Sequence, residues 1–234
     1  MRSIVLTDKG KRKINQDFVL VQNISPDTFL MLIADGMGGY SNGEIAAKVV
    51  SENILTFLST VKDIKSNHIQ KAVNKANLVL KQMKEDSQEK MGATIGGIIL
   101  SKKEALCFWV GDVKIFHFKN NKLHYESNPH SLMNQIIENG SITDVERVSK
   151  YKHVVTRSVQ GDVEQSQIDY CKIENLTAHD MLLICSDGVH DVYDGIQIQQ
   201  ILNTSDTVDE AMRRIEKRLL IEAKDNFSLI MAGY

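Results

Sequence analysis

The sequence has few of the features that would place it outside the ordinary globular proteins. Its 234 residues include only two prolines, and no low-complexity tract or linker-like run divides them. No stretch of about 18 uninterrupted apolar residues occurs, so we expect no membrane span. A net charge of −2 offers no strongly basic surface to a nucleic acid. We therefore expect one domain over residues 1–234, with neither a membrane nor a nucleic acid as partner.

Cysteine is also scarce, and its positions bear on the cellular compartment. Cys107, Cys171 and Cys185 are odd in number and form no Cys-x-x-Cys pair. Two of them lie in the apolar runs "ALCFWV" and "LLICSD", which is typical of buried free thiols in a reducing compartment. The first residues, "MRSIVLTDKGKRKINQD", lack the apolar core of a signal peptide. These features predict a cytoplasmic protein, and we expect it to be a monomer.

Apolar periodicity indicates a mixture of strands and helices. Strands are expected at about 17–22, 28–34, 93–100, 104–110, 113–118, 122–127, 153–158, 180–185 and 227–232. Helices are expected over 44–59, 67–84, 130–139 and 208–223. The segment "KIFHFKNNKLHYES" is typical of an antiparallel hairpin that turns at its two asparagines. Because strands cluster and helices come in pairs, the pattern favours an α+β fold over a doubly wound parallel sheet.

Aspartates recur at the ends of the expected strands. Asp35, Asp112 and Asp187 end or follow the apolar runs "FLMLIADG", "LCFWVGD" and "MLLICSDG", whereas Asp17 and Asp225 precede such runs. Any one of them could belong to an ordinary turn. Five converging carboxylates, however, would repel one another unless cations neutralised them. Because hard divalent cations prefer carboxylate oxygens, the recurrence favours a shared metal site.

Other chemical motifs are missing or weak. "GMGGYSNG" lacks the GK[ST] of a phosphate-binding P-loop. The HExxH spacing of zinc hydrolases does not occur, and Ser186 in "CSDG" lacks the glycine two residues before it that the GxSxG motif of serine hydrolases requires. "GATIGG" resembles dinucleotide-binding glycine spacing only loosely, and we expect its glycines to serve packing. His190, beside the Asp187 motif, is a candidate for proton transfer, although a simple exposed position is the more economical expectation.

Taken in order, eight segments of the chain resemble one known family. "RKINQD", "IADGMGGYSNGEIAA", "MGATIGG", "WVGD", "HSLMNQIIENGSIT", "VVTRSVQGD", "LLICSDGVHD" and "AKDNFSLI" follow the motif series of the metal-dependent protein phosphatases. These are the type 2C serine/threonine phosphatases, and the compact bacterial form is the most similar. The resemblance covers about residues 3–232. It implies a four-layer αββα sandwich of two antiparallel sheets flanked by helix pairs, and a flap at about 141–166 beside the catalytic cleft.

The resemblance also implies a set of metal ligands. Asp35 would bridge two Mn²⁺ or Mg²⁺ ions, with the carbonyl of Gly36 on one of them. Asp187 and Asp225 would complete the shell of the first ion. Asp112 and Asp187 would hold a third, weaker ion.

The remaining implied roles concern that third ion and the substrate. Asp191 is a candidate further ligand of the third ion. Arg12 would bind the substrate phosphate, and Asp17 would orient metal-bound water. Among the departures from the family pattern, Gln16 stands where many members have a glutamate, and Met37 stands where some eukaryotic members have a histidine. Neither change removes a metal carboxylate, so an active enzyme is expected.

The leading interpretation is a protein serine/threonine phosphatase in which a water bridged between two ions attacks the phosphate, reversing a cognate kinase. One alternative is a non-catalytic module of the same fold that binds a phosphoprotein and regulates a partner. Another keeps the catalysis but moves it to a narrower substrate, such as a phosphoserine on an anti-sigma-factor antagonist. The catalytic residues do not distinguish the last possibility from general kinase reversal.

Overall fold

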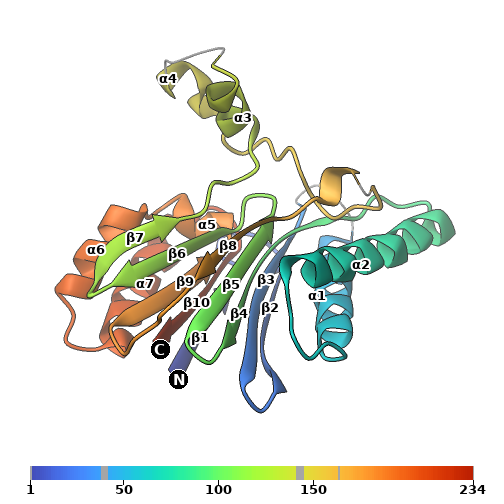
Figure 1. Ribbon diagram of the computed structural model, residues 1–234. Coiled ribbons are helices and arrows are strands. Elements are labelled where there is room, and N and C mark those ends of the chain that lie inside the picture. The colour runs from blue at the N-terminus through green and yellow to red at the C-terminus, as the bar shows by residue number, and fades with distance from the viewer. Residues whose placement is uncertain (1, 38–41, 141–144, 163, 234) are drawn as a thin grey trace.

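The computed structural model describes residues 2–37, 42–140, 145–162 and 164–233. In this part of the chain, two five-stranded antiparallel sheets pack face to face, and helices cover the outer face of each sheet (Figure 1). The α+β sandwich that the sequence predicts is therefore confirmed. Among the helices described, none combines the length and hydropathy required of a membrane span.

Each sheet joins strands that are distant in the sequence. One sheet has the order β1 (Arg2–Asp8), β10 (Phe227–Gly233), β9 (Asp180–Cys185), β6 (Lys114–Lys119) and β7 (Lys122–Glu126). The other has the order β2 (Asp17–Ser25), β3 (Thr28–Gly36), β4 (Ala93–Ser101), β5 (Glu104–Val110) and β8 (Asp169–Ile173). All neighbouring pairs are antiparallel. The two chain ends therefore lie side by side, because β1 pairs with β10.

The helices form two outer layers and a separate projection. The α-helices are α1 (Gly43–Leu58), α2 (Ser66–Ser87), α3 (Leu132–Glu138), α4 (Val145–Val148), α5 (Asp187–His190), α6 (Gly195–Asn203) and α7 (Val208–Glu222). Two 3-10 turns, η1 (Ser149–Tyr151) and η2 (Glu164–Ser166), lie between α4 and β8. The helices α1 and α2 cover the β2-to-β8 sheet, and α6 and α7 cover the opposite sheet (Figure 1).

Successive apolar side chains of the central strands point to opposite faces of the sheet, so each strand contributes to the core on both faces. In β3, Leu32 packs toward α1 and α2, whereas the next residue, Ile33, packs between the sheets. In β9, Leu183 faces α6 and α7, whereas Ile184 packs between the sheets. Sheets buried on both faces need nearly continuous apolar strands, which is what the sequence contains. The strand ends are consequently held by packing from two sides.

Most of the predicted elements are confirmed, with differences of a few residues at their ends. The strand predicted at 153–158 is wrong, because this segment pairs with its neighbours only through an isolated bridge between Ser131 and Val155. Its apolar residues belong to a loop that returns from the projection. The strands β1 and β8 and the helices α5 and α6 were not predicted. The hairpin is confirmed, with positive φ of 50° at Asn120 and 57° at Asn121.

Residues 132–140 and 145–154 project from the sandwich, and we call these two described segments the projection. Its helices α3 and α4 stand apart from both sheets in Figure 1. Hydrogen bonds close its base, from Leu132 N to Val154 O at 2.7 Å and from Thr156 N to His130 O at 2.8 Å. The predicted flap, 141–166, overlaps the projection but begins inside it. Residues 141–144 and 163 of that predicted flap lie outside the described residues.

The glycine pair of "GATIGG" serves packing, as expected. A Cβ added at Gly97 in β4 would meet Phe108 at 2.3 Å, and one added at Gly96 would meet Val113 at 2.4 Å. Both neighbours are fully buried. The absence of a side chain here lets the neighbouring aromatic and aliphatic groups fill the core.

We predict that Gly97→Ala lowers the free energy of unfolding by about 1–3 kcal/mol, because overpacking forces the buried Phe108 ring to move. Urea unfolding measures the change. Gly233→Ala is the matched control, since a Cβ there meets nothing within 4 Å; its effect should stay within about 0.5 kcal/mol. Equal stability of the two variants would contradict the packing role.

Candidate functional site

A cavity of about 640 Å³ lies at the edge of the sandwich where several strands begin or end. Five aspartates line it: Asp35, Asp112, Asp187, Asp191 and Asp225. Asp35 lies at the end of β3, Asp112 follows β5, and Asp187 opens α5. Asp191 follows α5, and Asp225 precedes β10. Arg12, Gly36 and Met37 also line this cavity. The structure thus brings together all but one of the residues to which the resemblance assigns a metal-binding or catalytic role.

The remaining one, Asp17, does not line the cavity but lies beside Asp35, which does. Asp17 opens β2 and is the register partner of Asp35 at the end of β3. Like charges directly opposite on neighbouring strands are destabilising. Asp17 Oδ2 accepts a hydrogen bond from Ser186 Oγ at 2.8 Å, whereas Oδ1 is buried with no partner among the described residues. Burial raises the pKa of Asp17 to about 6.

Burial and mutual repulsion also raise the pKa values of the other carboxyl groups at this site. Burial, followed by the charges of Asp17 and Asp187, raises the pKa of Asp35 well above its ordinary value. Burial, followed by the charge of Asp112, also raises the pKa of Asp187 well above its ordinary value. Burial raises the pKa of Asp112, whose Oδ1 is a second buried oxygen without a partner in the described part of the chain. These shifts identify a place where positive charge is favoured.

The donor set fits a hard divalent cation. The described His, Cys, Asp and Glu side chains include no group of three already gathered as a complete ligand set. The cavity nevertheless offers carboxylates without a competing thiol, and the unpartnered oxygens of Asp17 and Asp112 are ones that a cation or its water could satisfy. Gly36 also lines the cavity, and the position requires a glycine, because a Cβ there would meet the Gly43 carbonyl oxygen at 2.3 Å.

A loop between β1 and β2 carries Arg12 to the cavity. Arg12 donates to Asp225 Oδ2 at 2.6 Å, and this hydrogen bond raises the pKa of the guanidinium. Asn226 holds the loop from beneath: its Oδ1 accepts from Gln16 N at 2.9 Å, and its Nδ2 donates to Ile14 O at 2.8 Å. Sequence reasoning missed Asn226. Its only signal is its place next to Asp225 in "AKDN".

Comparison with known proteins decides the family. The sequence model of the family Protein phosphatase 2C matches residues 9–225. The chain belongs to the protein phosphatase 2C family.

Relatives of similar length support this assignment. The chain is similar to a Mycoplasma pneumoniae protein assigned as a protein phosphatase, with 30% identity over 96% of this chain and 92% of the relative. Its identity to the serine/threonine phosphatase stp of Listeria monocytogenes serotype 4b is 26%, over 96% of this chain and 92% of that protein. The solved structure of Stp1 from Staphylococcus aureus has the same fold, with a TM-score of 0.89, 23% identity, and coverage of 99% and 94%.

In this protein phosphatase 2C chain, Asp191 differs from the other cavity aspartates. It is paired with residues at the end of the projection, with Lys152 Nζ at 2.9 Å and His153 Nδ1 at 3.6 Å. Asp191 is therefore already partly neutralised by the chain itself. Sequence reasoning missed Lys152 and His153, because no pattern relates two residues of a polar loop to a carboxylate about 40 positions later.

The expectation that His190 occupies an exposed position is wrong. Its ring is half-buried and forms a hydrogen bond to the Asp112 backbone carbonyl at 2.9 Å. Burial, followed by the charge of Lys114, lowers the pKa of His190 to about 4. The neutral ring thus braces the backbone of Asp112 from the side of α5.

The carboxyl shifts predict an unusual pH dependence for the metal-free phosphatase. Between the ordinary value of 3.8 and about 6 for Asp17, the folded protein keeps protons on Asp17, Asp35, Asp112 and Asp187 that the unfolded chain releases. These four carboxyl groups outnumber the opposite contribution of His190, whose pKa is lowered in the folded protein. The protein's free energy of unfolding should therefore fall as pH rises through this window and beyond, where Asp35 and Asp187 ionise. Each kcal/mol lost lowers the melting temperature by about 2–4 °C.

Thermal unfolding in EDTA at pH 5, 6 and 7.5 tests this prediction. Millimolar Mn²⁺ should restore the melting temperature at pH 7.5, because a ligand that binds only the folded state stabilises it. Asp35→Asn should flatten the pH dependence. A melting temperature that rises with pH in EDTA would contradict the account of the cavity.

Proposed function

We propose that this chain is a protein serine/threonine phosphatase that hydrolyses phosphoserine and phosphothreonine with two Mn²⁺ or Mg²⁺ ions, or three, and so reverses a cognate kinase. One observation carries the proposal: aspartates from separate strand ends surround a single cavity that an arginine also lines. The names of the relatives support it, among them protein phosphatase PhpP of Streptococcus pneumoniae, 28% identical over 88% of this chain. A solved structure of this fold, PstP, is in complex with 2 manganese ions.

The proposal extends to the whole chain and its surroundings. Residues 1–234 would act as one catalytic domain and as a monomer, with a flap at about 141–166, which overlaps the projection, beside the cleft. The thiols of Cys107, Cys171 and Cys185 are free, which supports the expectation of a cytoplasmic location.

Four carboxylates and one carbonyl would hold the cations. Asp35 and the Gly36 carbonyl, with Asp187 and Asp225, would form the principal ligand set, and Asp112 would share a further ion with Asp187. Asp191 would join Asp112 only by exchanging its contacts with the projection for a cation. Bound divalent ions would supply an activated water and would neutralise the charge that grows on the phosphoryl oxygens.

The chain's own residues would position the substrate and the water. Arg12 has a side chain that is 55% exposed and lines the cavity. Its planar fork can donate two parallel hydrogen bonds to a phosphate, and a lysine cannot reproduce that geometry. Asp17 would accept a hydrogen bond from the attacking water through its buried, unpartnered Oδ1. Ser186 would keep the other carboxylate oxygen of Asp17 fixed.

Hydrolysis of p-nitrophenyl phosphate and of a phosphothreonine peptide should require millimolar Mn²⁺. Asp35→Asn and Asp187→Asn should each lower kcat by about 100-fold or more, the scale expected when an electrostatic group of an active site is removed. Asp27→Asn is the control, because Asp27 is exposed in the turn at the far end of β2 and β3. Folded wild-type protein that turns over neither substrate with any divalent ion would instead favour a non-catalytic phosphoprotein-binding module.

Arg12→Lys should raise KM for the phosphothreonine peptide by about 10-fold with a smaller change in kcat, because it removes one bond of a bidentate contact made before and during reaction. Steady-state kinetics measure the separate effects on KM and on kcat. Lys11→Ala, which changes an exposed cation in the same loop, should leave KM unaltered. An unchanged KM in Arg12→Lys would exclude Arg12 as the phosphate-binding residue.

A further inference from the structure

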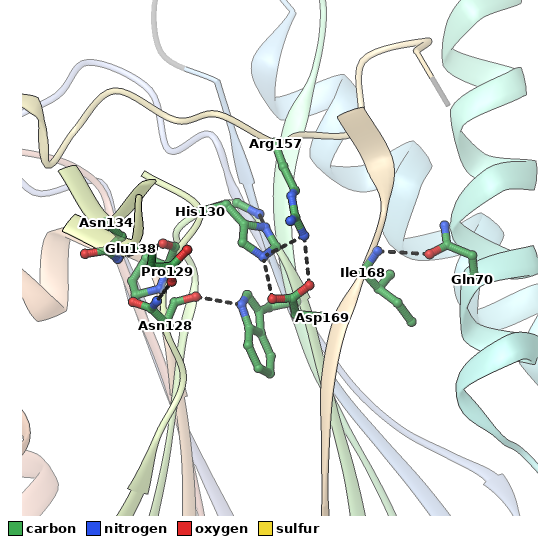
Figure 2. Close-up of polar contacts among 11 residues, drawn as sticks. Gln70, Asn128, Pro129, His130, Asn134, Glu138, Arg157, Ile168 and Asp169 are labelled. Atoms are coloured by element: carbon green, nitrogen blue, oxygen red, sulfur yellow. Dashed lines mark hydrogen bonds and ion pairs between the residues drawn. The ribbon is translucent and has the colours of Figure 1, made fainter. Parts of the chain in front are cut away.

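A polar cluster lies outside the cavity, at the root of the projection. We call His130, Arg157 and Asp169 the root cluster. Figure 2 shows that the side chains of His130 and Arg157 both contact the Asp169 carboxylate. Arg157 Nη1 donates to Asp169 Oδ1 at 2.8 Å, and His130 Nε2 lies 3.3 Å from Asp169 Oδ2. The His130 side chain is only 7% exposed, whereas that of Asp169 is 46% exposed. The mechanism proposed above uses none of these residues.

His130 makes a two-point contact with the residue before Asp112. The His130 amide donates to the Gly111 carbonyl at 2.8 Å, and the Gly111 amide donates to His130 Nδ1 at 3.0 Å. Gly111 has a φ of +103°, and Thr94 would lie 2.3 Å from a Cβ placed there. The direction in which the chain leaves β5 toward Asp112 is therefore fixed by the backbone and ring of one histidine.

The hydrogen bonds of the His130 ring determine which of its two nitrogens carries the proton. Nδ1 can accept from Gly111 only when it carries no proton, which places the proton of a neutral ring on Nε2, facing Asp169. Burial and the charge of Arg157 lower the pKa of His130, in agreement with a neutral ring. Asp169 is held in turn from α2, because Gln70 Oε1 accepts from the amide of Ile168 at 2.9 Å (Figure 2).

Both sides of the projection's root meet at His130. The His130 carbonyl accepts from Thr156 N, on the returning side, at 2.8 Å. Four residues before Thr156, Lys152 reaches Asp191 in the cavity at 2.9 Å. On the outgoing side, Trp109 Nε1 donates to the Asn128 carbonyl at 2.9 Å. One residue thus connects the end of β5, the root of the projection and the edge strand β8.

We infer that His130 is a positioning residue: held by Asp169 and Arg157, it orients the Gly111–Asp112 backbone and anchors the projection so that Asp112 and Lys152 face one cavity. The inference rests on the proposed function only in taking Asp112 as a cation ligand. His130 itself touches neither the cavity nor a reacting group. Its influence would pass through the position of Asp112.

Isosteric variants separate this role from general stability. An asparagine at position 130 carries its carbonyl oxygen near the place of Nδ1 and can still accept from Gly111. A glutamine carries its polar atoms near Nε2 and cannot. We expect His130→Ala and His130→Gln to speed amide hydrogen exchange in the segment containing Gly111, and to weaken Mn²⁺ binding at Asp112 by about 10-fold. His130→Asn should recover most of both properties.

The experiment measures exchange by mass spectrometry and Mn²⁺ binding by calorimetry, without reference to turnover. His179→Ala, at an exposed histidine before β9, is the control. Asp112→Asn supplies the reference for the ion at Asp112. The double variant His130→Ala/Asp112→Asn should bind Mn²⁺ as Asp112→Asn alone does, because two changes that act through one ligand are not additive.

Several results would overturn the inference: exchange around Gly111 equal to that of the wild type, Mn²⁺ affinity within two-fold of it, or equal effects of asparagine and glutamine. If His130→Ala does not fold, the comparison of asparagine with glutamine decides, since both retain a polar side chain of similar size. A wild-type protein that binds Mn²⁺ but hydrolyses no phosphoester would end the proposed function while leaving this test intact. Active protein with unaffected His130 variants would end the inference alone.

Discussion

Repulsion among closely spaced carboxylates, one buried and three half-buried, is the constraint on which this structure depends. Asp17 and Asp35 face each other across β2 and β3, and Asp187 and Asp112 stand nearby at the ends of the other sheet and of β5. Burial disfavours the charged form of each group, and the neighbouring charges add to that effect. Such an arrangement survives only if the scaffold resists relaxation. It is also the arrangement that a divalent cation stabilises most.

The sandwich supplies that resistance. The strands that carry the aspartates are packed on both faces, between the sheets and against the outer helices, so their ends cannot splay without opening the core. Side-chain hydrogen bonds then fix the loops at the edge. Asn226 holds the Arg12 loop, and Ser186 holds Asp17. His130 holds the turn before Asp112. Rigid strands and braced loops together keep like charges close, which is a condition of preorganised electrostatic catalysis.

The sequence revealed the elements whose signals are local. The apolar runs of β3, β5 and β9 and the aspartates at their ends are legible because burial on two faces demands such runs and because the chemistry repeats. The motif series then ordered the aspartates into one site. In contrast, β8 was missed because five residues, "DYCKI", alternate too briefly to stand out. The false strand at 153–158 has the right periodicity, but among the described residues it pairs only through one isolated bridge, between Ser131 and Val155.

The contacts that brace the site were not predictable in the same way. His130, Arg157 and Asp169 come from segments 12 to 39 residues apart and meet only because the projection returns to the sheet edge. The Lys152–Asp191 pair and the partners of Asn226 depend likewise on long-range folding. His190 has a polar side chain that the sequence suggested would be exposed, yet the Asp112 carbonyl offers it a partner in a half-buried place. Local pattern carries no information on such partners.

Anomalous diffraction at the manganese edge, from crystals of the wild-type protein grown with Mn²⁺, would show whether these carboxylates hold cations. We expect at least two anomalous peaks among Asp35, Asp187 and Asp225, with oxygen ligands at about 2.2 Å, the distance typical of hard divalent cations of this size. Crystals grown with millimolar Mn²⁺ that show no anomalous peak among these carboxylates would contradict the assignment of a metal site. The raised pKa values would then mean protonated, hydrogen-bonded carboxyl groups that need no cation.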